Sequence, residues 1–208
     1  MDALVGERAA RLERLARRLK TNEARLLLID EVLGPHIDAV VKNYDPSRIR
    51  VSHGAATLAA DIEQHRPDFA LYFKMRALPR EQTELLFRAP DLAWLHLSSV
   101  GTDHVADWRD FPVTVTNALG VLSRFSADYA ITSMLALNID LHRYAEQKPD
   151  RLWRQFLWQP LEKQTALVVG VGAIGGIVAS RAKALGMRVI GVRANPRAHP
   201  GVDEMVKT

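Results

Sequence analysis

The sequence has no cysteine, so it can form no disulfide, thiolate metal site or cysteine nucleophile. It also lacks a long apolar run. The longest stretch without charged or polar side chains extends from Ala166 to Ala179 and includes four glycines, which is short of the roughly 20 residues of a membrane helix. Near the N-terminus, charged residues such as Arg8 and Glu13 interrupt any apolar segment of the signal-peptide kind. We therefore expect a cytoplasmic protein with no membrane partner and no metal site.

Runs of one charge sign are missing as well. The 28 Lys and Arg residues outnumber the 24 Asp and Glu residues, but they are spread along the chain and leave a net charge of +4. A nucleotide or an acidic substrate explains this balance as well as nucleic acid does, so no nucleic-acid partner is predicted. With 48% hydrophobic and 25% charged residues, the 208-residue chain has the composition of a globular protein of one or two domains.

The first 20 residues have helical periodicity. Four apolar residues recur at helical spacing, and arginines occupy the remaining face: Leu12, Leu15, Ala16 and Leu19. This pattern predicts an N-terminal amphipathic extension over residues 1–22 whose apolar face packs on the body or on a neighbouring subunit. An arm for nucleic acid or a membrane surface is the alternative, which Glu7 and Glu13 disfavour.

Short apolar runs then alternate with helical segments over residues 23–117. The expected strands are 25–30, 50–52, 69–73, 92–97 and 113–116. The expected helices are 57–65 and 80–88, the latter with Leu85 and Leu86 facing inward. Short continuous apolar strands separated by helices are typical of a parallel sheet covered on both faces. We therefore predict an α/β fold in which a small flavodoxin-like, doubly wound domain comes first.

A second domain is expected over residues 118–208. Ser126 is a plausible N-cap for a long helix with five apolar residues near one face: Ile131, Met134, Leu135, Leu137 and Leu141. The irregular segment 147–160 follows, and the pattern of a Rossmann domain comes after it.

Three glycines carry the strongest motif of the sequence. A strand at Thr165–Val169 leads into Gly170, Gly172 and Gly175, and a helix to about residue 185 and a strand at 188–192 follow. Gly170 permits a tight turn, Gly172 lets the backbone approach a pyrophosphate, and Gly175 lets the helix pack close to the strand. The order of strand, turn, helix and strand predicts a dinucleotide site; a glycine-rich turn of another α/β fold is the alternative.

The cofactor is expected at the N-terminus of that helix, on Ala173 and Ile174 beside the glycines, because free N–H groups and the helix dipole attract an anion there. No acidic residue occurs from Lys163 to Val202, although NAD-preferring Rossmann domains usually place one at the end of the second strand. Arg193 stands there instead. With Asn195 and Arg197 behind it, Arg193 favours NADP(H) over NAD(H), since a guanidinium matches a 2′-phosphate. A solvent-exposed arginine without this role is the alternative.

Taken together, these motifs resemble the D-isomer-specific 2-hydroxyacid dehydrogenases, which include glyoxylate and hydroxypyruvate reductases. The resemblance covers about residues 24–197. It rests on four segments and the glycine motif that follows them: Trp94-Leu-His-Leu-Ser-Ser-Val-Gly-Thr-Asp-His104, Val115-Thr-Asn-Ala-Leu-Gly-Val-Leu122, Ser126-Ala-Asp-Tyr129 and Trp153-Arg154.

The resemblance implies an NAD(P)-dependent oxidoreductase that reduces a small 2-oxoacid by hydride transfer. The first domain would bind the substrate, with backbone N–H groups of Ser99, Val100 and Gly101 on the carboxylate and Asp103 in a structural role. Arg76 stands where several family members carry a substrate arginine; a solvated loop arginine is the alternative.

The family's catalytic arginine, acidic residue and histidine are expected beyond Thr208, and none of the seven histidines matches that motif. We therefore expect a truncated Rossmann domain that supplies only its first two strands and is inactive alone, and a homodimer when intact. The alternatives are a nucleotide-sensing, corepressor-like binding protein on the same fold and an inactive truncated product.

Overall fold

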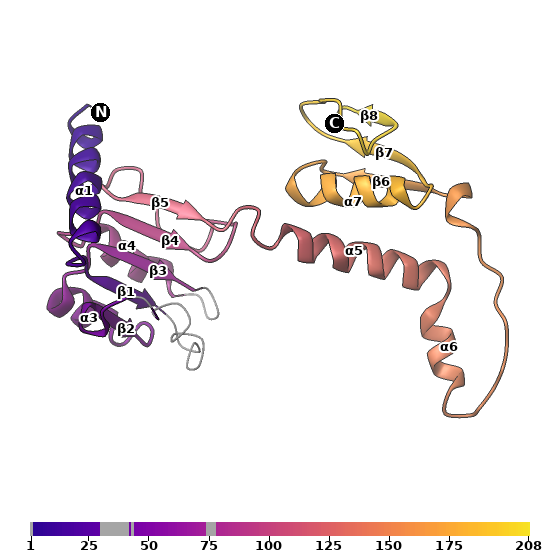
Figure 1. Ribbon diagram of the computed structural model, residues 1–208, viewed down its shortest axis with the longest axis horizontal. Coiled ribbons are helices and arrows are strands. Elements are labelled where there is room, and N and C mark those ends of the chain that lie inside the picture. The colour runs from indigo at the N-terminus through magenta and orange to yellow at the C-terminus, as the bar shows by residue number, and fades with distance from the viewer. Residues whose placement is uncertain (1, 30–41, 43, 74–77) are drawn as a thin grey trace. The chain divides into compact units, whose positions relative to one another are not determined.

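A computed structural model describes residues 2–29, 42, 44–73 and 78–208. The chain forms two compact units, Met1–Ala118 and Leu119–Thr208, and each has its own parallel sheet (Figure 1). Within the described ranges, no helix is long and apolar enough to cross a membrane.

The first unit is built on a five-stranded sheet in the order β2-β1-β3-β4-β5. Its strands are β1 (Leu26–Ile29), β2 (Ile49–Ser52), β3 (Phe69–Tyr72), β4 (Trp94–Leu97) and β5 (Thr114–Asn117). All neighbouring strands are parallel. This order is that of flavodoxin-like doubly wound sheets, so the predicted fold class is confirmed.

The strands of the first unit end at one height. Tyr72 at the end of β3 pairs with Leu97 of β4, and Leu97 pairs with Asn117 of β5. The turns that follow these strands therefore begin side by side at the carboxyl edge of the sheet.

Two helices, α3 (Leu58–His65) and α4 (Arg80–Arg88), contribute to the larger of the unit's two apolar clusters. In α4, Leu86 is buried as predicted, but Leu85 is 37% exposed and Phe87 takes its place in the core. The buried residues Thr83, Leu86 and Phe87 have the spacing i, i+3, i+4 of one helix face, and Leu85 lies beside that face.

Helix α1 (Asp2–Lys20) contacts the body of the first unit through Leu15 and through four arginines: Arg8, Arg11, Arg14 and Arg18. Leu15 is the one residue that the helix buries. Three apolar residues seven positions apart remain exposed: Val5, Leu12 and Leu19. Of the predicted apolar face, only Leu15 is buried on the body, and packing of this face on a neighbouring subunit stays a prediction.

The arginines of α1 bind backbone carbonyls of the loops that precede two strands. Arg8 Nη2 donates to the Phe111 carbonyl at 2.8 Å, ahead of β5, and Arg11 Nη1 donates to the Leu92 carbonyl at 3.0 Å, ahead of β4. A guanidinium offers five N–H donors in a rigid fork, which suits the unpaired carbonyls of such loops. The helix is thus anchored across the amino edge of the sheet.

Asp68 connects this helix to the strands. Its side chain is 1% exposed and accepts hydrogen bonds from Arg18 Nη1 at 2.7 Å and from the Arg25 backbone N–H at 2.8 Å. Its backbone carbonyl accepts the Ala93 N–H at 2.8 Å. A single aspartate, Asp68, therefore joins α1 to the segments that enter β1, β3 and β4.

The second unit holds a three-stranded parallel sheet in the order β6-β7-β8. Its elements are α5 (Ser123–Asn138), α6 (Leu141–Gln147), β6 (Thr165–Val169), α7 (Ala173–Ala184), β7 (Arg188–Val192) and β8 (Glu204–Val206). The expectation of only two strands is wrong, because β8 adds a third that pairs with β7 from Ile190 to Val192. At three residues, β8 is too short to show an alternating pattern.

The long helix α5 begins earlier and ends sooner than expected. It starts at Ser123, with Leu122 in the N-cap position, so the prediction of Ser126 as the N-cap is wrong. It stops at Asn138, and Asp140 with a φ of 54° separates it from α6. Of the five apolar residues predicted on one face, Ile131 and Met134 pack against the apolar cluster around α7. Leu137 and Leu141 are exposed.

We expect Asp68→Asn to destabilise the first unit by about 2 kcal/mol or more, because it leaves Arg18 and Arg25 without their buried carboxylate. Hydrogen exchange of the β1 and β3 amides, which reports the free energy of opening, measures the change. Asp107→Asn is the matched control. Hydrogen bonds from Arg109 lower the pKa of Asp107 to about 2, but this pair is on the surface and should contribute little. Equal protection in the two variants would contradict the role of Asp68.

Candidate functional site

In open α/β sheets, ligands bind outside the carboxyl ends of the strands. Each unit carries one predicted group of site residues there: Ser99, Val100 and Gly101 follow β4 after Ser98, and the glycine motif follows β6. Arg76 lies outside the described residues. We therefore describe two separate turns, one in each unit.

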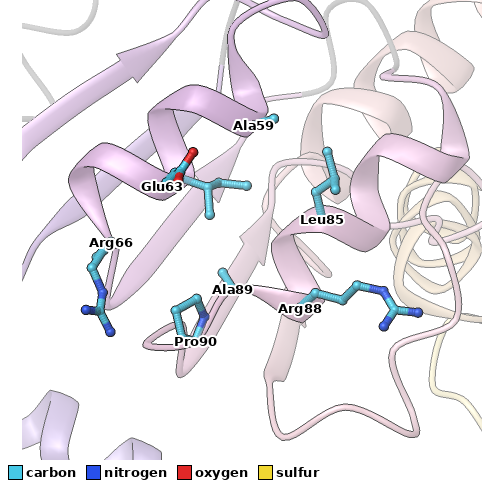
Figure 2. A pocket seen from close by; sticks show the side chains of 8 residues that line it. Ala59, Glu63, Arg66, Leu85, Arg88, Ala89 and Pro90 are labelled. Carbon is cyan, nitrogen blue, oxygen red and sulfur yellow. The ribbon is translucent and has the colours of Figure 1, made fainter.

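A groove of about 420 Å³ lies elsewhere, between α3 and α4 of the first unit (Figure 2). Its lining reaches the C-terminal ends of both helices, which lead into the amino ends of β3 and β4. Two arginines line it. Arg66 is paired with Asp91 at 2.9 Å and Arg88 with Glu84 through its Nε at 3.0 Å, so acidic side chains of the chain itself balance both charges. The groove lies on the side of the amino ends of the strands, and its two arginines are already paired, so we do not take it as the active site.

The turn after β4 is fixed by hydrogen bonds to neighbouring strands. Ser98 donates its N–H to the Tyr72 carbonyl of β3 at 2.9 Å. The Ser99 carbonyl accepts the Ala118 N–H at 3.2 Å, and the Val100 carbonyl accepts Asn117 Nδ2 at 2.8 Å. Three consecutive residues of the turn are thus held, the last two by the end of β5.

Gly101 closes this turn. Its carbonyl accepts the Ser99 hydroxyl at 3.0 Å, and a Cβ at position 101 would lie 2.8 Å from Asp103 Oδ1. Any larger residue would have to displace the Asp103 carboxylate. Because Val100 is 48% exposed, a ligand can approach the turn from solvent.

His104 lies close to the same turn. Its Nε2 is 3.5 Å from Ser99 Oγ, and its ring centroid is 5.7 Å from that of Tyr72, at the end of β3. The sequence alone indicated only a loop residue near Gly101, because the contact with β3 joins positions 32 residues apart.

Other histidines have structural contacts. His65 Nε2 is 3.0 Å from the Leu26 carbonyl, and burial lowers the pKa of this imidazole below its usual value. His96 Nδ1 is 2.8 Å from the Thr116 hydroxyl on the surface of the sheet. Neither imidazole lies in one of the two turns.

The turn after β6 has the backbone that the glycine motif predicts. Gly170 has a φ of +92°, in the left-handed region that favours glycine, and its N–H donates to the Val192 carbonyl at 2.9 Å. Gly172 donates to the Gly170 carbonyl at 2.9 Å and holds the N-cap position of α7. Ala173 and Ile174 are the first residues of that helix.

Two glycines of the motif meet different surroundings. A Cβ at Gly175 would lie 2.1 Å from the Gly170 carbonyl oxygen, a backbone atom that cannot move aside. A Cβ at Gly172 would meet nothing within 4 Å. Gly175 therefore lets α7 pack on the turn, whereas Gly172 borders open space before the helix N-terminus. This open space and the first-turn N–H groups of α7 fit the pyrophosphate of a dinucleotide.

Arg193 directly follows β7, and its N–H donates to the Val206 carbonyl at 3.0 Å. Since Val192 pairs with Val169, Arg193 stands level with the turn that starts at Gly170. Asn195 and Arg197 are exposed in the next segment. In the part of the chain that the structure describes, neither Arg193 nor Arg197 takes part in an ion pair.

Residues 131–207 match the sequence profile of the family "D-isomer specific 2-hydroxyacid dehydrogenase, NAD binding domain". The match includes the glycine turn and all three strands of the second unit. This chain is related to the D-isomer-specific 2-hydroxyacid dehydrogenases. The resemblance seen in the sequence motifs is thereby confirmed.

Curated relatives agree with this relationship. A glyoxylate reductase of Thermococcus litoralis is 35% identical over 118 residues, which cover 51% of this chain and 36% of that protein. An erythronate-4-phosphate dehydrogenase of Pseudoalteromonas translucida is 28% identical over 117 residues, which cover 55% of this chain and 27% of that protein. The match thus spans about a third of the length of these relatives.

A solved structure of a D-isomer specific 2-hydroxyacid dehydrogenase family protein from Aeromonas salmonicida superposes with a TM-score of 0.71 at 26% identity. The match covers 89% of this chain and 58% of that one. Other structures with this fold are complexes with NAD and with NADP. The α/β architecture of the chain is therefore that of the dehydrogenase family.

We expect the two glycines to respond differently to alanine. Gly175→Ala should destabilise the second unit by about 1–3 kcal/mol, because its Cβ collides with a backbone carbonyl. Gly172→Ala should change the stability much less, because its Cβ meets nothing within 4 Å, but it should weaken NADPH and NADH binding at least tenfold. Thermal unfolding and fluorescence titration measure the two effects. A Gly172→Ala chain that binds either cofactor normally would remove this turn from the site.

Proposed function

We propose that this chain supplies the substrate-binding and cofactor-binding units of an NAD(P)-dependent oxidoreductase of the D-2-hydroxyacid dehydrogenase type, which reduces a small 2-oxoacid. The observation that carries the proposal is the glycine turn before α7, in a segment that matches the family's NAD-binding profile. The first unit would bind the substrate and the second the cofactor. When bound, the nicotinamide supplies the hydride; the residues of the chain bind and orient the two molecules.

The cofactor would lie on the N-terminus of α7. Gly170 and Gly172 shape the turn, Gly175 brings the helix close, and the first helical residues Ala173 and Ile174 offer backbone N–H groups to the pyrophosphate. The positive end of the helix dipole adds to this attraction.

The proposal includes a preference for NADP(H). Arg193 extends from the end of β7, level with the glycine turn, where a 2′-phosphate of the adenosine ribose would lie. Asn195 and Arg197 follow it in exposed positions, and no acidic residue occurs between Lys163 and Val202 to repel the phosphate.

Arg193→Asp should therefore reverse the preference between NADPH and NADH. The lost charge-assisted contact corresponds to about 1.5–3 kcal/mol, or roughly a tenfold or larger change in the dissociation constant. Fluorescence titration of the chain with each cofactor measures it. Arg188→Gln is the matched control, because this arginine lies at the other end of β7 and pairs with Glu204. Equal affinities of the unmodified chain for both cofactors would end this part of the proposal.

The substrate carboxylate would lie on the turn after β4. The backbone N–H groups of Val100 and Gly101 face away from the carbonyls that β5 holds, and Ser99 completes the turn. Backbone N–H groups in such a turn form a concavity that binds anions. A contribution of Arg76 to this site remains a prediction.

Oxalate tests the carboxylate site in the chain as it stands. In a titration followed by ¹H–¹⁵N correlation spectra, the amide protons of Val100 and Gly101 should shift downfield. Gly101→Val should abolish the shifts, because its side chain displaces Asp103 and fills the turn. Binding of NADPH to the second unit should stay the same. Oxalate that shifts only resonances outside residues 98–104 would exclude this turn as the substrate site.

The curated relatives described above do not favour a corepressor-like binding protein, since they are a reductase and a dehydrogenase. No residue of the chain is proposed as the proton donor of the reaction. Because the match spans about a third of the relatives, the experiments above measure binding and not turnover. A homodimer remains a prediction, which analytical ultracentrifugation would test.

A further inference from the structure

We infer that Asn117 is a positioning residue that aims the Gly101 N–H at the substrate carboxylate. The inference rests on the carboxylate site proposed above. It concerns a residue that the sequence motifs include but to which they give no role.

The direction of one group in a peptide unit fixes the direction of the other. In a trans peptide the C=O of one residue and the N–H of the next point in opposite directions, and the described residues have no cis peptide bond. Asn117 Nδ2 donates to the Val100 carbonyl at 2.8 Å, so this carbonyl points toward β5. The Gly101 N–H must therefore point away from β5.

The preceding peptide unit is held in the same way. The Ser99 carbonyl accepts the Ala118 N–H at 3.2 Å, which directs the Val100 N–H away from β5 as well. Two successive N–H groups on one side of the chain give the paired donors that a carboxylate requires. The end of β5 thus orients both donors without reaching the ligand.

The two anchors differ in how they depend on the sequence. Ala118 uses its backbone N–H, which any residue except proline supplies. Asn117 uses its side-chain amide, and only the NH₂ of that amide can donate to a carbonyl. In the register of β5 with β4, Asn117 pairs with Leu97, the last residue of β4, so its side-chain amide lies beside the start of the turn. The identity of residue 117 therefore controls the Gly101 donor and leaves the Val100 donor in place.

The experiment compares Asn117→Ala and Asn117→Asp with the unmodified 208-residue chain. On addition of oxalate, the downfield shift of the Gly101 amide proton should disappear in both variants, while that of Val100 persists. The dissociation constant for oxalate should rise at least about fivefold, the effect of one hydrogen bond. Thr116→Ala is the control, because the Thr116 hydroxyl contacts Trp94 and His96, away from the turn. It should leave both shifts unchanged.

A second measurement needs no ligand. Residual dipolar couplings report the orientation of each N–H bond, and that of Gly101 should change in Asn117→Ala while those of β4 and β5 stay the same. An unchanged Gly101 coupling in Asn117→Ala would overturn the inference. So would the loss of both oxalate shifts together with changed couplings in β5, because that result would mean that Asn117 only stabilises the strand. If oxalate fails to shift either amide in the unmodified chain, the substrate proposal fails, and the couplings alone decide the role of Asn117.

Discussion

The buried carboxylate of Asp68 is the contact on which the first unit depends most. It lies at the amino edge of the sheet, where Arg18 of α1 and the backbone of Arg25 both donate to it. These bonds fix where β1 and β3 begin relative to each other. The Asp68 backbone carbonyl accepts the Ala93 N–H and fixes the start of β4 in the same way. Because parallel strands of equal length that start together also end together, order at this edge determines where the turns at the opposite edge stand.

In both candidate sites, we propose that backbone N–H groups bind the anionic group of the ligand, and in the second unit Arg193 adds a charged side chain. In the first unit, two peptide units are turned by β5, and in the second, the first turn of α7 offers its N–H groups. A backbone donor keeps its charge distribution at any pH and loses little conformational entropy when a ligand binds. It is specified, however, by residues that hold the main chain, such as Asn117 and Gly175, and not by a group that touches the ligand.

The sequence predicted most of the secondary structure and the glycine turn, since both follow from local periodicity and from spacing. Helix α4 and strand β6 have the predicted bounds. The orientation of α1 could not be predicted, because amphipathic spacing does not tell whether arginines meet water or carbonyl groups. The role we propose for Asn117 could not be predicted either, since it depends on a hydrogen bond across the sheet to Val100. Such contacts between strands leave no periodic pattern.

The anchoring of α1 through main-chain carbonyls has a consequence for how this unit can evolve. Arg8 and Arg11 bind Phe111 and Leu92 through atoms that every amino acid possesses. The side chains of those loops can therefore drift without loss of the contact, provided that the path of the backbone is kept. The arginines themselves have no such freedom. Substitution of either arginine breaks the contact, whereas side-chain substitutions in the loops leave it intact. The sequence of the loops should therefore diverge faster than the arginines of the helix.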